Sequence, residues 1–168
     1  EKALRYKLAK WEAGIPFDLL SDWVQQSMPT EMFNAVCRYT SFIHDLWVGF
    51  PCRPGVFIEQ EVDVSRWVPG GFGTCDCLLI GGGLLHIIDF KYGQGVPVNP
   101  ERNPQLMYYA LGACELFRET DEIEVVRMSI VQPRMQEEPQ TWELPLADLL
   151  TWAREVLAPA AHMAWRGE

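Results

Sequence analysis

An acidic residue and a lysine, Asp89 and Lys91, stand two positions apart at the end of the apolar run 84–88. Side chains two apart on a β-strand point to the same face, so this carboxylate and this ammonium would stand side by side. A strand this apolar is expected to be buried on both faces, where charge is rare unless it has a use. The pair therefore marks a candidate reactive site, with a structural ion pair as the alternative.

A second acid, Asp76, borders the apolar run 77–80, and three glycines at 81–83 turn the chain between the two runs. An even hairpin loop, of two or four residues, pairs Ile80 with Leu85 and hence Asp76 with Asp89. We then expect the two carboxylates on one face of adjacent antiparallel strands, with Cβ atoms about 4.5–5.5 Å apart. An odd loop would send them to opposite faces.

Two carboxylates held close together repel, and burial disfavours both charged forms. A divalent cation resolves this conflict, because Mg²⁺ binds one or two carboxylates and keeps several waters. Lys91 could then orient or deprotonate a metal-bound water, or neutralise an oxyanion that develops in the reaction. This group of residues suits phosphodiester hydrolysis with Mg²⁺ or Mn²⁺.

Two neighbouring segments carry further polar candidates. Apolar and polar residues alternate over 56–64, which predicts a half-buried strand with Glu59 and Glu61 on one face. Pro100 and Asn103-Pro104 precede a helical pattern in which Gln105 and Tyr109, four apart, share a face. These two side chains could hold a substrate phosphate or base, although Tyr109 could equally be a core residue.

The remaining pattern predicts one domain over 1–168, with a helical part at 1–50, a catalytic core at 55–135 and a C-terminal helix at 145–166. Strand 4 should run parallel to strand 3 through a right-handed crossover, because a helix separates them. The expected helices are 2–13, 17–27, 30–48, 103–118 and 146–164, and the expected strands are 56–64, 72–80, 84–91 and 122–133.

The stretch 57–113 resembles the catalytic core of the PD-(D/E)XK nuclease superfamily, in its RecB-like and lambda-exonuclease-like branch. That branch has a Glu on the first strand, a Gly-x-x-Asp strand, an (Asp/Glu)-x-Lys strand and a helix with Gln-x-x-x-Tyr. The residues at 71–74 and 103–106 are similar to those of a phage-associated subgroup of this branch. The four motifs fall here, in order, on Glu59, on Gly73 to Asp76, on Asp89 to Lys91, and on Gln105 to Tyr109.

The resemblance implies an α/β fold with a restriction-endonuclease-like core, a mixed central sheet flanked by helices in the order αβββαβ, and extra N-terminal helices. It implies a metal-dependent deoxyribonuclease, an exonuclease acting on single strands or DNA ends in phage-type recombination. Asp76, Asp89, the Phe90 carbonyl and Glu59 would bind the metal. Lys91 would act on the attacking water, and Gln105 and Tyr109 would position substrate.

Two other functions remain open. Relatives carry a histidine on an N-terminal helix, where Tyr6 stands here, and His44 is a candidate substitute that we leave out of the site. This departure favours the first alternative, an inactive nuclease-fold module that binds nucleic acid or a phage recombination partner. The second alternative is a small-molecule enzyme that uses paired carboxylates as acid and base.

Composition limits the setting in which this chemistry would occur. Of 168 residues, 48% are hydrophobic and 22% charged, with no run of about 20 apolar residues that would span a membrane. Five cysteines without zinc spacing or a signal peptide favour a reducing, cytoplasmic location, and we expect no iron–sulfur cluster within this fragment. The net charge of −9 opposes nucleic-acid binding, although Lys2, Arg5, Lys7 and Lys10 gather on the first predicted helix.

Overall fold

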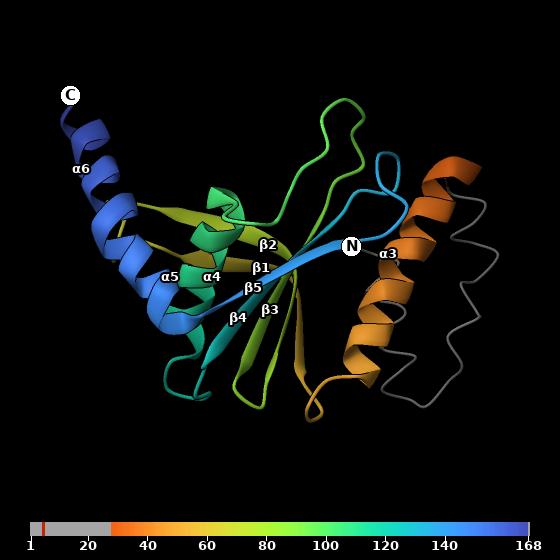
Figure 1. The fold of residues 1–168 in the computed structure, drawn as a ribbon, viewed down its shortest axis with the longest axis horizontal. Coiled ribbons are helices and arrows are strands. Elements are labelled where there is room, and N and C mark those ends of the chain that lie inside the picture. The colour runs from red at the N-terminus through yellow and green to blue at the C-terminus, as the bar shows by residue number, and fades with distance from the viewer. Residues whose placement is uncertain (1–4, 6–27, 168) are drawn as a thin grey trace.

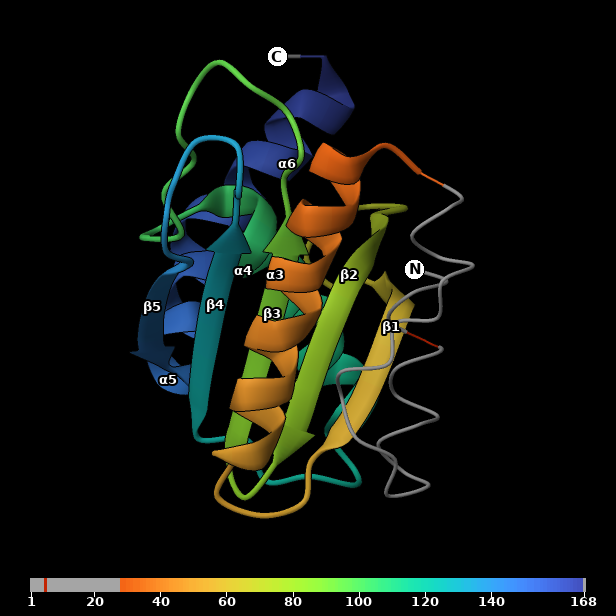
Figure 2. The ribbon, with the colours of Figure 1, turned by 90° about the vertical axis from the view of Figure 1, so that its right-hand side faces the viewer.

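The computed structural model describes Arg5 and residues 28–167. In this part of the chain, five strands form one sheet in the order β1-β2-β3-β4-β5. Helix α3 (Thr30–Val48) lies across one face of the sheet, and α4 (Pro104–Phe117) and the C-terminal helices lie on the other, as Figure 1 and Figure 2 show. The fold is therefore a mixed α/β sandwich. The strands are β1 (Gly55–Asp63), β2 (Phe72–Gly81), β3 (Leu84–Phe90), β4 (Val125–Val131) and β5 (Gln140–Pro145).

The predicted elements that fall on described residues are all present. The helix predicted over 30–48 has those bounds, and strands and helices elsewhere differ at their ends by at most a few residues. The predicted helices 2–13 and 17–27, with Tyr6, lie outside the described residues apart from Arg5. Among the described residues, no helix combines the length and apolarity that crossing a lipid bilayer requires.

The hairpin between β2 and β3 has the predicted even loop. Ile80 pairs with Leu85 and Gly81 with Leu84, which leaves Gly82 and Gly83 as the turn. Both have positive φ, 55° and 80°, as the two central residues of a type I′ turn require. The right-handed twist of this turn matches that of the strands, so two glycines fix the register of the whole hairpin.

Strands β3 and β4 run parallel, as predicted, with Asp89 paired to Ile130 and α4 crossing between them. The sheet separates two apolar cores. The larger core lies under α4 and the C-terminal helices and includes Leu78, Ile87 and Leu111. The smaller core lies under α3 and includes Tyr39, Ile43 and Ile88. Strand β3 is thus covered on both faces, which accounts for its continuous apolar run.

The alternation of side chains changes face at Glu59 in β1. Phe57 and Val62 both pack on the α4 side although an odd number of positions separates them, and Ile58 packs on the α3 side. Glu59 has a φ of 52°, which is uncommon for a residue other than glycine. The strict period-2 alternation expected for this strand, which would put Glu59 and Glu61 on one face, therefore stops at Glu59.

The predicted sheet lacked β5. This strand pairs with β4 in antiparallel register, Met128 opposite Trp142 and Ser129 opposite Thr141. It lies at the edge of the sheet, where a proline is tolerated, and Pro139 precedes the strand while Pro145 is its last residue. Behind it, α5 (Leu146–Trp152), the π-helical turn η1 (Ala153–Leu157) and α6 (Ala158–Arg166) form the predicted C-terminal helix in three joined pieces.

One buried histidine in β3 makes the stability of the fold pH-dependent. His86 is 0% exposed, with Nε2 2.7 Å from Ser129 Oγ and Nδ1 without a hydrogen-bond partner among the described residues. Burial, and secondarily the charge of Arg127, lowers the pKa of His86 from 6.5 to about 3. Between these two pH values the imidazole of His86 is therefore protonated in the unfolded chain and neutral in the folded chain.

We predict that the free energy of unfolding decreases as the pH falls below 6.5, with about 2 kcal/mol lost by pH 5 from His86 alone. Urea unfolding at successive pH values measures this slope. A His86→Gln variant lacks the titrating group and should show a correspondingly shallower pH dependence. Identical slopes in the two proteins would contradict the assignment.

Candidate active site

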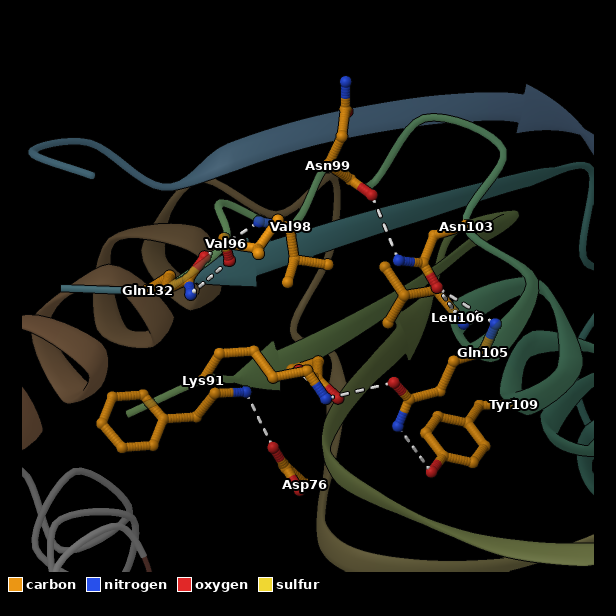
Figure 3. Close-up of polar contacts among 12 residues, drawn as sticks. Asp76, Lys91, Val96, Val98, Asn99, Asn103, Gln105, Leu106, Tyr109 and Gln132 are labelled. Atoms are coloured by element: carbon orange, nitrogen blue, oxygen red, sulfur yellow. Dashed lines mark hydrogen bonds and ion pairs between the residues drawn. The ribbon is translucent and has the colours of Figure 1, made fainter. Parts of the chain in front are cut away.

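The two acidic residues predicted to face each other lie at the end of the β2–β3 ladder. The ladder's last pair is Cys77 with Ile88, and the same register continued by one step sets Asp76 opposite Asp89. Asp76 does not continue the backbone ladder. Instead, its Oδ2 accepts a hydrogen bond of 2.7 Å from the backbone N–H of Phe90 (Figure 3). A carboxylate thus replaces a backbone carbonyl where the two strands separate.

Asp89 is the buried member of the pair. It is 4% exposed, and burial together with the charge of Asp76 raises its pKa, while Lys91 opposes both effects. Lys91 Nζ lies 3.1 Å from Asp89 Oδ2, so the two side chains form an ion pair, although no hydrogen bond of standard geometry reaches this oxygen from the described residues. Buried charge is normally paired in this way, because an isolated ion in a protein interior is strongly destabilising.

Helix α4 presents Gln105 and Tyr109 on one face, as predicted, and adds both side chains to the polar contacts of Lys91. Lys91 Nζ donates to Gln105 Oε1 at 3.1 Å, and Gln105 Nε2 donates to Tyr109 Oη at 2.9 Å. Figure 3 shows these three side chains in a row, with Asp76 beside them. Helix α4 begins where it does because Asn103 Oδ1 accepts from the N–H groups of Gln105 and Leu106 and Pro104 follows it.

Two glycines at the start of β2 make room for the tyrosines of α4. A Cβ atom on Gly73 would lie 2.7 Å from the Tyr109 ring, and one on Gly71 would lie 2.6 Å from the hydroxyl of Tyr108. Any larger residue at either position would push a tyrosine away from the strand. Gly73 therefore allows the ring of Tyr109, the hydrogen-bond partner of Gln105, to pack closely against β2.

Glu59 lies next to Asp76 in the neighbouring strand. The pairs Ile58–Cys77 and Gln60–Cys75 bracket Glu59 and Asp76, so both leave the regular ladder at the same level of the sheet. Glu61, the second candidate for this position, lines a separate surface groove with Asp63 and Phe72. The structure thus brings Glu59, and not Glu61, beside the paired acids.

The loop between Lys91 and α4 is fastened at several points. Gln132, at the end of β4, accepts from Val98 N at 3.0 Å and donates to Val96 O at 3.2 Å (Figure 3). Asn103 Nδ2 donates to Asn99 O at 3.1 Å. These hydrogen bonds attach the loop that joins Lys91 to Gln105 at its middle and at its end. They therefore help to hold β3 and α4 at a constant distance from each other.

The residues at this site fit a hard divalent cation. The carboxylates of Asp89 and Asp76 are the oxygen ligands that the ends of β3 and β2 supply, and the carbonyl of Phe90 is the third predicted ligand. Among the described residues, no group of three or more His, Cys, Asp or Glu side chains is arranged to hold a metal ion. A Mg²⁺ site does not need one, because water completes its shell around one or two carboxylates.

Sequence reasoning missed one residue at this site, Tyr39 of α3. Its ring lies 4.8 Å from that of Phe90, centroid to centroid, and is 6% exposed. The spacing of Ala35, Tyr39 and Ile43 indicates an inward-facing helix stripe, but not that a hydroxyl would lie near acids. His44, the substitute considered for a metal ligand, has Nδ1 3.5 Å from Asp45 Oδ1 on the same helix.

Fold and site together define a mixed α/β protein with a charged, partly buried polar site at the end of two central strands. The chain belongs to the family described as "Protein of unknown function (DUF2800)", whose model matches residues 2–168. Among solved structures it is similar to one described as "Crystal structure of SSO0001", with 16% identity over 92% of this chain and 68% of that chain. The TM-score of 0.34 is too low to establish a shared fold.

We predict that Gly73→Ala destabilises the protein by about 1–3 kcal/mol, because the new methyl group must displace the Tyr109 ring. Gly93→Ala is the matched control, since a Cβ there meets nothing within 4 Å. Chemical denaturation of both variants measures the difference. An equal stability for Gly73→Ala and the parent would mean that Tyr109 is not held against β2.

We also predict that Asp89→Asn stabilises the metal-free protein, because it removes a buried charge that lacks full hydrogen bonding. A gain of about 1 kcal/mol would raise the Tm by about 2–4 °C. Thermal unfolding in EDTA measures this, with Glu138→Gln as the control for loss of an exposed acid. A lower Tm for Asp89→Asn would show that the Asp89–Lys91 pair is a structural ion pair.

Proposed function

We propose that this protein is a metal-dependent nuclease that hydrolyses DNA phosphodiester bonds, with a restriction-endonuclease-like core. The observation that carries the proposal is the buried Asp89 carboxylate, 3.1 Å from the ammonium of Lys91 and, by the register of β2 and β3, opposite Asp76. A purely structural ion pair does not need a second acid beside it, because neighbouring carboxylates disfavour each other's charged form. The four sequence motifs point to the same residues.

In this proposal Asp76, Asp89 and the Phe90 carbonyl hold Mg²⁺ or Mn²⁺, with Glu59 as an auxiliary ligand. The cation, when bound, would lower the pKa of a coordinated water and neutralise charge on the phosphate. Lys91 orients or deprotonates the attacking water, or stabilises the charge that develops in the transition state. Gln105 holds the Lys91 ammonium at 3.1 Å and, with Tyr109, contacts the substrate.

The charge of the chain sets the expected mode of substrate binding. With a net charge of −9, affinity for DNA must come from a local cationic surface and should decrease steeply with salt. Arg5 supports such a surface, because its Nη2 donates to the carbonyl of Ile58 at 3.0 Å, directly before Glu59. We propose single strands or DNA ends as the substrate, and a phage-type recombination protein as a partner.

The second candidate function is a nuclease-fold module that binds nucleic acid or a recombination partner without cleaving it. Tyr6, in place of the histidine of related nucleases, is the feature that favours it. DNA binding without Mn²⁺-dependent cleavage in the assay below would establish this alternative.

We predict that Lys91→Ala abolishes cleavage of end-labelled single- and double-stranded DNA while the Tm stays close to that of the parent. The reason is that the partly exposed ammonium serves the transition state more than the fold. Arg154→Ala, which removes a cation from η1, is the control and should cut at the parent rate. Cleavage by Lys91→Ala at the parent rate would make Lys91 a structural residue.

The same assay tests the metal. Mg²⁺ or Mn²⁺ should support cleavage, and Ca²⁺ should do so poorly because it accepts a larger and looser ligand shell. Equal rates in EDTA would remove the metal mechanism.

A further inference from the structure

Tyr39 is a buried phenol whose hydroxyl has no hydrogen-bond partner among the described residues. It lies on the inner face of α3, and its aromatic ring packs on Phe90 at 4.8 Å with an interplanar angle of 37°. Buried tyrosines usually find a partner for the hydroxyl, since an unpaired polar group inside a protein is destabilising. The fold therefore leaves the buried hydroxyl of Tyr39 without a hydrogen-bond partner in the described part of the chain.

The ring of Tyr39 lies beside the candidate site. Phe90, on which the ring packs, donates its backbone N–H to Asp76 at 2.7 Å, and Cys77 beside Asp76 belongs to the same small core as Tyr39. These contacts place Tyr39 next to the strand ends that carry Asp76 and Asp89. Burial raises the pKa of Tyr39, with smaller contributions in the same direction from Cys77 and from these acids.

A tyrosine hydroxyl can donate one hydrogen bond and can also accept one. It is a poor direct ligand for Mg²⁺, which prefers carboxylates, carbonyls and water. A water bound to the cation is a strong hydrogen-bond donor, because the metal polarises its O–H bonds, and the Tyr39 oxygen can accept from it. Groups that hydrogen-bond to the ligands of a metal orient those ligands and tune the affinity of the site.

We infer that Tyr39 is a positioning residue, which hydrogen-bonds from α3 to a water in the shell of a divalent cation held by Asp76 and Asp89. This inference rests on the metal site of the proposed function and adds to it a contribution from the α3 side of the sheet. It gives the unpaired hydroxyl of Tyr39 a partner in the metal-bound state. It also gives α3 a role in the site beyond covering the small core.

The test compares Mn²⁺ binding by calorimetry in the parent protein and in three variants. Tyr39→Phe keeps the ring on Phe90 and removes only the hydroxyl. Tyr108→Phe is the matched control, because its hydroxyl already donates to the carbonyl of Phe72. Asp89→Asn removes a proposed ligand. The Tm of each protein in EDTA is measured alongside.

We expect Tyr39→Phe to bind Mn²⁺ about 10–100-fold more weakly than the parent, as is typical when a group that supports a metal ligand is removed. Its Tm in EDTA should equal or exceed that of the parent, because the lost hydroxyl has no partner in the metal-free protein. Tyr108→Phe should bind Mn²⁺ normally, and Asp89→Asn should lose binding.

Parent-like Mn²⁺ affinity in Tyr39→Phe, with binding lost in Asp89→Asn, would overturn the role of Tyr39 and leave the metal site intact. A lower Tm for Tyr39→Phe in EDTA would likewise overturn it, since the hydroxyl would then have a structural partner. Parent-like affinity in Asp89→Asn, or no Mn²⁺ binding by the parent, would overturn the metal site itself and this inference with it.

Discussion

The pairing of β2 with β3 is the constraint on which the rest of the site depends. Two glycines in left-handed conformations close the hairpin, and every residue pair up to Cys77 and Ile88 follows from that turn. Because the register is fixed at the turn, its continuation by one step beyond Cys77 and Ile88 sets Asp76 opposite Asp89. The repulsion between these acids is a consequence of the backbone, and the surroundings must accommodate it.

The two acids have different surroundings. Asp76 receives the backbone N–H of Phe90, whereas Asp89 receives a nearby ammonium and keeps an unsatisfied oxygen. The remaining polar groups hold that ammonium in place, from Gln105 through Tyr109 to the glycines that admit the tyrosine ring. Asp89 is therefore held rigidly in an unfavourable environment. Such local destabilisation, supported by a rigid scaffold, is typical of functional sites.

Much of this arrangement could be predicted from the sequence because it depends on local rules. Strand parity and hairpin loop length are properties of short segments, so the β2–β3 register, which ends one step before Asp76 and Asp89, followed from residue counts alone. The i, i+4 spacing of Gln105 and Tyr109 likewise puts both side chains on one face of any α-helix. The catalytic roles of these residues, in contrast, remain predictions.

Features that depend on tertiary packing were not predictable in this way. The change of face at Glu59 comes from one positive φ angle in a residue that seldom adopts it. Strand β5 was not predicted from the sequence, because prolines stand at its two ends and its pairing with β4 is its main support. The environment of Tyr39 is set by three strands together, so nothing in the sequence around α3 could reveal it.

The edge position of β5 has a consequence for how copies of this protein meet. An exposed edge strand offers unpaired N–H and C=O groups to another chain, and long flat edges invite sheet-to-sheet aggregation. Here the strand is short, and Pro139 and Pro145 lack N–H donors at its two ends. Glu143 of this strand forms an ion pair with Arg127 of the neighbouring strand β4. A second molecule would find few donors in register at this edge. The sheet is thus protected against growing by addition of strands on the β5 side.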